Sequence, residues 1–406
     1  MHKIVIGLGF GDEGKGMAVA HEVERIKNSD VEPVVVRFNG GPQAGHNVRV
    51  KSDGKILHHT HSQFGSGALL GANTVITRDT LFDPLTFVEE AKHLSKVMGR
   101  DMTGTVTLDG GCPMVTMLHV YASREIAAKN GHGSTGKGIG VARLCDKAVA
   151  KCDVSPEMRL EAGDVLWSSL GKLLDKLIFW REYIDVHFGT SLRERLPDDE
   201  VYAWAKRLHH SLDGLNVIGA GDAMGFTKHV MTFREYGIVF EGSQGMLLDQ
   251  RCGWFPHVTH GDMSAFEARR AFPKAKVIGV TRSYQTRHGA GPMPTEFTCD
   301  IPETDNVYNE WAGEFRTGLL DMPNLGRAAA ETCVDEVAIS NLDRYPGKWV
   351  SAWSRTEREG CDRPVPHGAT VIEGDEDKFV KAVESVCGAP VTVVGRGPVT
   401  DEWYDR

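Results

Sequence analysis

The chain has 406 residues, of which 41% are hydrophobic, and a formal net charge of −9. A chain of this length can bury the core of one large domain or two closely joined ones. No apolar run approaches the roughly 18 residues of a membrane span, and no basic segment followed by a long apolar one marks a signal peptide. The acidic balance without long basic runs argues against a nucleic-acid surface. We therefore expect a cytoplasmic protein that binds neither membrane nor nucleic acid and holds anionic ligands with local loops.

The amino end reads as a strand, a glycine-rich loop and a helix. Ile4–Ile6 is an apolar run, Gly7–Gly14 forms the loop, and a helical pattern follows. Gly9–Lys15 fits the phosphate-loop pattern G-x-x-x-x-G-K, whose lysine reaches terminal phosphates, but Gly16 stands where a magnesium-binding Ser or Thr is expected. Asp12 is the obvious replacement ligand, because a carboxylate among phosphates is costly unless it binds metal or moves a proton.

A second buried strand, Pro33–Phe38, runs into another glycine-rich loop, Asn39–Asn47. Open α/β sheets bind ligands at this end of their strands. His46 could face bound phosphates there as a proton donor, although a purely structural histidine is the alternative. His59 and His61 share one face of a later strand without a carboxylate or cysteine at ligand spacing, so we expect no metal site between them.

The rest of the chain continues the alternation of strands and helices. Buried strands are expected at 105–109, 237–241, 277–281, 337–339 and 390–394, a helix at 114–129, and polar glycine-rich loops at 131–140, 242–245, 286–292 and 395–398. The pattern predicts an α/β fold: a large, mostly parallel twisted sheet with a phosphate loop of the P-loop type and helical insertions. Without an internal repeat or linker, residues 1–406 are expected to form one domain, with a helical insertion at about 155–215.

These loops, in this order, resemble adenylosuccinate synthetase, the ligase that joins aspartate to carbon 6 of IMP with a nucleoside triphosphate. The matching motifs are Gly11–Gly16, Ala44–His46, Ser134–Gly140, Phe240–Gly245, Leu247–Asp249, Pro256–Thr259 and Thr286–Pro292. They span residues 4 to about 296, and several motifs in one order are far more specific than any one alone. The resemblance implies Mg²⁺, a nucleoside triphosphate, a 6-oxopurine monophosphate and L-aspartate as ligands, and a homodimer.

The resemblance also implies catalytic roles. Asp12 would remove the purine N1 proton so that O6 attacks the γ-phosphate, and with the backbone oxygen of Gly45 it would hold the metal. His46 would be the acid facing the transferred phosphoryl group, and Lys15 and Gln244 complete the catalytic set. Aspartate would then displace phosphate from a 6-phosphoryl intermediate, because a lactam oxygen leaves poorly until it is phosphorylated.

Three ligand-binding sets follow from the same resemblance. The set implied for the nucleoside triphosphate is Gly11, Glu13, Gly14, Lys15, Gly16, Met17, Gly45, Asn47, Asn341, Asp343, Gly395, Arg396 and Gly397. The set implied for the purine monophosphate is Asp12, Gln43, Ser134, Thr135, Gln244 and Thr259. The set implied for aspartate is Arg316, Thr317 and Arg287.

The carboxyl third departs from the family pattern. The aspartate loop, usually Thr-Thr-Gly followed by arginines, is replaced by 309–318, where Arg316–Gly318 is the main match. The guanine-reading Lys-x-Asp is replaced by Asn341–Asp343, which leaves ATP, dATP and GTP open as donors. The arginine that the family donates across its dimer interface has no clear counterpart in this sequence. Lys151 is the cationic residue nearest to its expected sequence position.

Several functions stay open at this point. The pattern is similar to phage synthetases that act on dGMP, but the best-known of these replace the loop aspartate, so Asp12 favours family-like chemistry on IMP or dGMP. A P-loop regulatory NTPase and a catalytically altered paralogue are the alternatives. A regulatory switch needs no second anion pocket, so the several glycine-rich loops favour the ligase.

Overall fold

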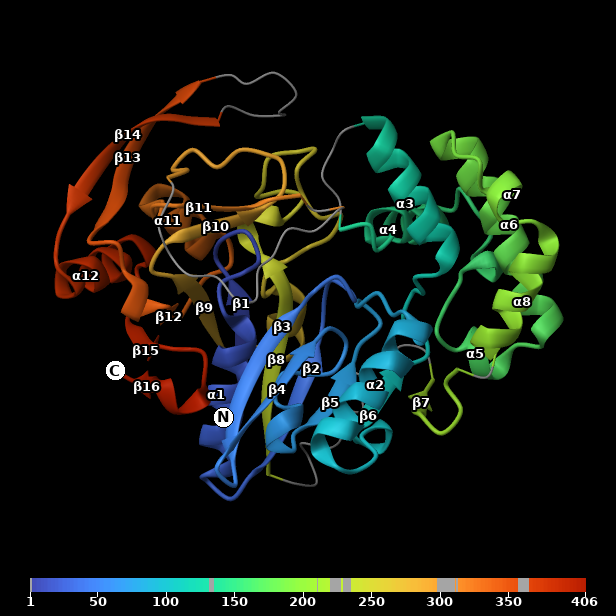
Figure 1. Cartoon of the computed structure of the whole chain (residues 1–406), viewed down its shortest axis with the longest axis horizontal. Helices are drawn as coiled ribbons and strands as arrows, with labels where there is room; N and C mark the ends of the chain where they lie inside the picture. Colours follow the sequence, from blue (N-terminus) through green and yellow to red (C-terminus); the bar gives the residue numbers. More distant parts are fainter. Residues whose placement is uncertain are drawn as a thin grey trace.

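A ten-stranded sheet forms the centre of the computed structural model, which describes residues 2–130, 135–209, 211–219, 228, 235–297, 311, 313–356 and 365–406 (Figure 1). The strand order is β16-β15-β12-β9-β1-β8-β2-β5-β6-β7. All neighbours pair in parallel except β15 and β16, which are antiparallel. The predicted α/β fold with a mostly parallel sheet is therefore confirmed.

The strands of this sheet include all five later strands expected from the sequence. They are β1 (Lys3–Gly7), β2 (Glu32–Arg37), β5 (Asn73–Ile76), β6 (Val106–Asp109), β7 (Asn216–Ile218), β8 (Tyr236–Gly245), β9 (Lys276–Arg282), β12 (Glu336–Ser340), β15 (Val391–Gly395) and β16 (Trp403–Asp405).

Three two-stranded antiparallel sheets complete the described strands. They are β3 (His46–Ser52) with β4 (Lys55–His61), β10 (Gln285–His288) with β11 (Phe315–Gly318), and β13 (Lys348–Thr356) with β14 (Val365–Glu373). Asp53 and Gly54, both with positive φ, make the tight turn between β3 and β4, which is the dipeptide that such hairpins favour. This hairpin carries His46 at its first residue.

The described residues also form eleven α-helices. They are α1 (Lys15–Lys27), α2 (Pro84–Met98), α3 (Met117–Asn130), α4 (Ile139–Ala150), α5 (Asp164–Trp167), α6 (Leu170–Phe188), α7 (Leu192–Arg195), α8 (Asp198–His209), α10 (Phe266–Ala271), α11 (Met322–Glu331) and α12 (Glu376–Cys387). Helices α5 to α8 fall inside the segment expected to be a helical insertion, while its limits and the single-domain organisation stay predictions. None of the helices in the described residues is long and apolar enough to cross a membrane.

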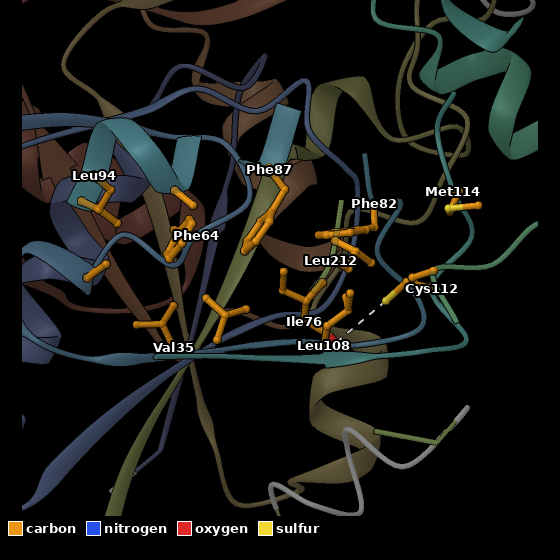
Figure 2. Close-up of a cluster of buried hydrophobic side chains, with 14 of the residues drawn as sticks. Val35, Phe64, Ile76, Phe82, Phe87, Leu94, Leu108, Cys112, Met114 and Leu212 are labelled. Atoms are coloured by element: carbon orange, nitrogen blue, oxygen red, sulfur yellow. Dashed lines mark hydrogen bonds between the residues drawn. The ribbon is translucent and has the colours of Figure 1, made fainter. Parts of the chain in front are cut away.

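Two hydrophobic clusters lie on opposite faces of the sheet. In β1, Val5 belongs to one cluster while Ile4 and Ile6 belong to the other, as the period-two alternation of a strand requires. Figure 2 shows the first cluster, where the rings of Phe64 and Phe87 stack with centroids 5.1 Å apart. With both faces covered, the carboxyl edge of the sheet is left as the place where polar loops meet.

Candidate active site

The phosphate loop between β1 and α1 is closed by its own side chains. Gly14 caps α1 with φ of 87°, a conformation that glycine adopts without strain. Lys15 is buried, and its Nζ donates to the Gly11 carbonyl at 2.7 Å and lies 3.1 Å from Glu13 Oε2. Glu13 Oε1 accepts from the Gly11 N–H at 2.6 Å. The Glu13 carboxylate, implied by the resemblance to bind nucleotide, therefore braces the loop from inside in this structure.

His46 explains why the loop has Gly16 instead of a hydroxyl residue. A Cβ atom on Gly16 would lie 2.8 Å from the Cβ of His46 and 3.2 Å from Ser66 Oγ. The start of α1 and the β3 hairpin thus approach too closely for a Ser or Thr side chain. The structure thereby places His46 beside the phosphate loop. The sequence predicted that His46, from the second glycine-rich loop, faces bound phosphates.

The His46 ring is held by a buried charged network. Its Nδ1 hydrogen-bonds the Glu241 carboxylate, and its Nε2 lies 3.2 Å from the Ser243 carbonyl oxygen. Glu241 also accepts from the Ser66 N–H at 2.9 Å and lies 3.3 Å from Arg37 Nη1. Because both ring nitrogens face protein acceptors, His46 must release one of these contacts before it can donate to a phosphate.

The charges of this network oppose the effect of burial. Burial disfavours the Glu241 carboxylate, but Arg37 and the hydrogen bond from His46 prevail and lower the pKa of Glu241 to about 2. Burial lowers the pKa of His46, against the opposing effect of Glu241. The sequence analysis assigned no role to Glu241; an acidic residue within a buried apolar strand is the signal that could have found it.

Asp12 contacts Arg282, a residue to which the sequence pattern gave no role. Its Oδ2 lies 2.6 Å from Arg282 Nη2, at the end of β9. In the described residues, no three His, Cys, Asp or Glu side chains gather as metal ligands. A cation at this loop would therefore take Asp12, backbone oxygen and the phosphate oxygens of its nucleotide, which is the ligand set Mg²⁺ prefers in phosphate sites.

One side chain implied for the purine nucleotide is buried without a hydrogen-bond partner among the described residues, and another lies against the phosphate loop. Both amide atoms of Gln43 are buried and have no hydrogen-bond partner among the described residues. Gln244 Oε1 would lie 2.7 Å from a Cβ on Gly11, so its amide covers the phosphate loop. Buried amides are almost always satisfied, and a bound base or phosphate would satisfy that of Gln43.

The remaining described residues implied for the purine nucleotide are less buried than the Gln43 amide. Thr259 is half-buried, and its N–H donates to Leu248 O at 2.8 Å. Thr135 is exposed, and Ser134 lies outside the described residues. Lys137 Nζ donates to Pro42 O at 3.1 Å and so joins the third glycine-rich loop to the second.

The loops implied for the donor base meet around Trp403. Trp403 Nε1 donates to Gly397 O at 3.2 Å, and a Cβ on Gly14 would lie 3.6 Å from Trp403 Cη2. Ser340 Oγ lies 2.8 Å from Glu13 O and 3.0 Å from Asn341 Oδ1. These contacts place the end of β12 and the loop after β15 against the phosphate loop.

The outer residues of these loops are less enclosed. Arg396 pairs with Glu376 on α12, and Asp343 Oδ2 lies 3.6 Å from Arg344 Nε. Burial raises the pKa of Asp343. Asn47 lies on the β3 hairpin, where its Oδ1 accepts from Thr60 Oγ1 at 2.6 Å.

The two arginines implied for aspartate are engaged by the protein itself. Arg316 Nη1 donates to Gly289 O at 3.0 Å and its Nε to Glu296 Oε1 at 2.8 Å. Arg287 Nη1 donates to Pro292 O at 2.8 Å, and its guanidinium lies over the Phe10 ring. Both side chains thus shape the polar loop after β10.

Thr317, the third aspartate candidate, is engaged in the same region. Its Oγ1 donates to the Phe297 carbonyl at 3.1 Å. Residues 309, 310 and 312 of the altered loop, and residues 298–308 before it, lie outside the described residues. The way in which aspartate is held stays a prediction.

The carboxyl edge thus brings together the glycine-rich loops after β1 and β2 (the second, 39–47, is the predicted second anion loop), the buried network around His46, and the loops after β12 and β15. This arrangement is typical of α/β nucleotide-binding enzymes. A model of the adenylosuccinate synthetase family matches residues 4–348. The adenylosuccinate synthetase of Picrophilus torridus is 31% identical over 357 residues, covering 84% of this chain and 77% of the relative. That of Thermotoga maritima is 29% identical over 420 residues, covering 98% of each.

Solved structures share the fold. The fully ligated adenylosuccinate synthetase of Plasmodium falciparum matches with a TM-score of 0.77 and 19% identity over 99% of both chains. The succinoaminodeoxyadenylate synthetase of cyanophage S-2L, bound to dGMP and dATP as an energy donor, matches with a TM-score of 0.62 and 18% identity, covering 100% of this chain and 95% of that chain. The chain belongs to the adenylosuccinate synthetase family, whose members are nucleoside-triphosphate-dependent carbon–nitrogen ligases.

Proposed function

We propose that this chain joins L-aspartate to carbon 6 of a 6-oxopurine monophosphate, either IMP or dGMP, and hydrolyses a nucleoside triphosphate through a 6-phosphoryl intermediate. The observation that carries the proposal is the unsatisfied amide of Gln43 in the second anion loop, whose His46 packs against the phosphate loop. Two anion loops in contact suit transfer of phosphate between two nucleotides, whereas a regulatory NTPase needs only one.

In this proposal Asp12 has two tasks, and Lys15 and His46 have one each. Asp12 takes the N1 proton of the purine, which places negative charge on O6 for attack on the γ-phosphate. Lys15 neutralises charge on the phosphates, and His46, held by Glu241, donates to the transferred group. Asp12 and the Gly45 carbonyl would hold Mg²⁺ when the nucleotide is bound, and the ion would supply charge neutralisation at the phosphates.

The donor and acceptor are proposed from the altered loops. Asn341 offers an amide donor and acceptor, the pair that matches the N6 and N7 positions of adenine, so we favour ATP or dATP over GTP. The cyanophage relative of similar fold is described with dGMP and dATP. From the family we also propose a cytoplasmic homodimer, for which light scattering of the purified protein should give twice the chain mass.

A substrate matrix tests the proposal. IMP, GMP, dIMP and dGMP are each combined with ATP, dATP or GTP, aspartate and Mg²⁺, and products are identified by mass. We expect a succinylated purine with IMP or dGMP, and most of it with an adenine donor. Triphosphate hydrolysis that ignores the purine monophosphate would instead show a regulatory NTPase.

Asp12→Asn tests the assigned base. The amide keeps the shape of the side chain but cannot accept a proton, so turnover should fall by about 10²-fold or more. Monophosphate binding, measured by calorimetry, should change little. Near-normal turnover of this variant would refute the role of Asp12 without affecting the reaction class.

His46→Ala should lower kcat to a similar degree.

A further inference from the structure

One buried arginine contacts both the main chain and the side chain of Asp12. Arg282 Nε donates to the Asp12 carbonyl oxygen, and Nη2 lies 2.6 Å from Asp12 Oδ2. On the other side, Nη1 lies 2.7 Å from the Tyr284 hydroxyl oxygen. A single planar guanidinium therefore holds the loop residue at two points and is itself held at a third.

The arginine is mounted on a rigid part of the fold. It ends β9, which pairs with β1 on one side and with β12 on the other. The Leu8 N–H donates to Val280 O at 2.9 Å, so the ladder between β1 and β9 continues one residue past β1 into the phosphate loop. Tyr284 is fully buried. Groups held by strands and buried neighbours are positioned more accurately than groups on free loops.

We propose that Arg282 is a positioning residue for Asp12, and that Tyr284 supports it. The guanidinium fixes the direction of the Asp12 carboxylate and the backbone beneath it, so that the carboxylate meets the N1 edge of the purine. This inference rests on the proposed function. A guanidinium is a rigid fork, whereas a lysine ammonium is a compact point charge on a flexible stem. Charge alone should therefore not replace it.

The fold offers a matched control. Arg269 on α10 donates to the Cys333 carbonyl oxygen at 2.9 Å and pairs with the Asp335 carboxylate, which repeats the carbonyl-plus-carboxylate contact of Arg282 away from the loops. Arg282→Lys and Arg269→Lys make the same chemical change in the two places. Tyr284→Phe removes only the hydroxyl that supports Arg282.

We expect Arg282→Lys to lower kcat by about 10²-fold, because a displacement near 1 Å at a reacting group has that effect. The Kd of the purine monophosphate, measured by calorimetry, should change less than about threefold, since uniform binding is not affected. Tyr284→Phe should lower kcat by about three- to tenfold, and Arg269→Lys should leave it unchanged. Free guanidinium ion should restore part of the kcat of Arg282→Ala, and ammonium ion should not, which no purely structural role predicts.

The outcomes separate this inference from the proposed function. If the wild-type enzyme forms product and Arg282→Lys keeps kcat within about twofold, the positioning role is wrong and the proposed function stands. If Arg282→Lys does not fold, an unchanged kcat in Tyr284→Phe refutes the role and a lowered kcat supports it. If the wild-type enzyme forms no succinylated purine with any pair of nucleotides, the proposed function fails, and the inference with it.

Discussion

Glu241 shows how much a single residue decides at this site. It lies in the middle of the sheet, fully buried, and joins Arg37, Ser66 and His46. A buried carboxylate is tolerated only when it is paired and hydrogen-bonded, and here the pairing also orients the His46 ring. The same residue therefore serves stability and the direction of the His46 ring.

Removing this charge should be strongly destabilising. Glu241→Gln leaves the Arg37 guanidinium buried without its carboxylate, so the free energy of unfolding should fall by about 3–5 kcal/mol, measured by urea titration. Glu89→Gln, in an exposed pair with Lys92 on α2, is the control and should stay within about 0.5 kcal/mol of wild type.

The same comparison has a defined pH dependence. The pKa of Glu241 is lowered to about 2 in the folded state from its ordinary value of 4.5, because Arg37 and the hydrogen bond from His46 outweigh burial. A lowered pKa adds stability above the unfolded value, and this stability is lost as the pH falls through the folded value. The gap between wild type and Glu241→Gln should be constant above about pH 5 and shrink toward pH 2. A gap that does not depend on pH would contradict the ionised carboxylate.

Among the helices, α6 contributes a buried apolar face to the core of the α5–α8 segment. Leu173, Leu177, Trp180 and Ile184 are buried at helical spacing, and Trp180 Nε1 donates to Met158 O at 2.8 Å. The sequence predicted helices in this segment, because a 3.6-residue apolar period requires only local information. The partners of the face were not predictable in that way.

The apolar face of α6 can be tested with two substitutions on one helix. Leu177→Ala should lower the free energy of unfolding by about 2–5 kcal/mol, because it leaves a cavity in a closed cluster. Val186→Ala, at a side chain that is 79% exposed, should change it by less than about 0.5 kcal/mol. Equal effects of the two substitutions in thermal or chemical unfolding would show that α6 does not pack as described.

At the scale of the whole molecule, the loops of the site come from strands across most of the sheet. The phosphate loop follows β1, the second anion loop follows β2, Gln244 lies on β8, and the donor-side loops follow β12 and β15. Parallel strands send all these loops to one edge (Figure 1). A ligand that bridges them should therefore stabilise the fold as a unit.

Ligand binding should appear as a rise in overall stability. A purine monophosphate at 100 times its Kd should add about 2.7 kcal/mol to the free energy of unfolding, since it binds the folded state alone. The corresponding nucleoside at the same concentration is the control and should add much less, because it lacks the phosphate that the anion loops would hold. Equal stabilisation by both compounds in thermal unfolding would contradict the second anion loop.

The buried strands and the glycine-rich loops were predictable from the sequence, because each depends on residue pattern within a short window. The α/β class followed from the alternation of strands and helices, and the family from the order of several motifs along the chain. The contacts of the site became visible only in the folded chain. Glu13 braces its own loop, Arg316 contacts the loop after β10, and Gly16 makes room for His46. Glu241 and Arg282 contact the two residues predicted to be catalytic. His46 and Glu241 are 195 positions apart, and Asp12 and Arg282 are 270 apart. Contacts at such separation arise from the order in which strands enter the sheet, and no local pattern records that order.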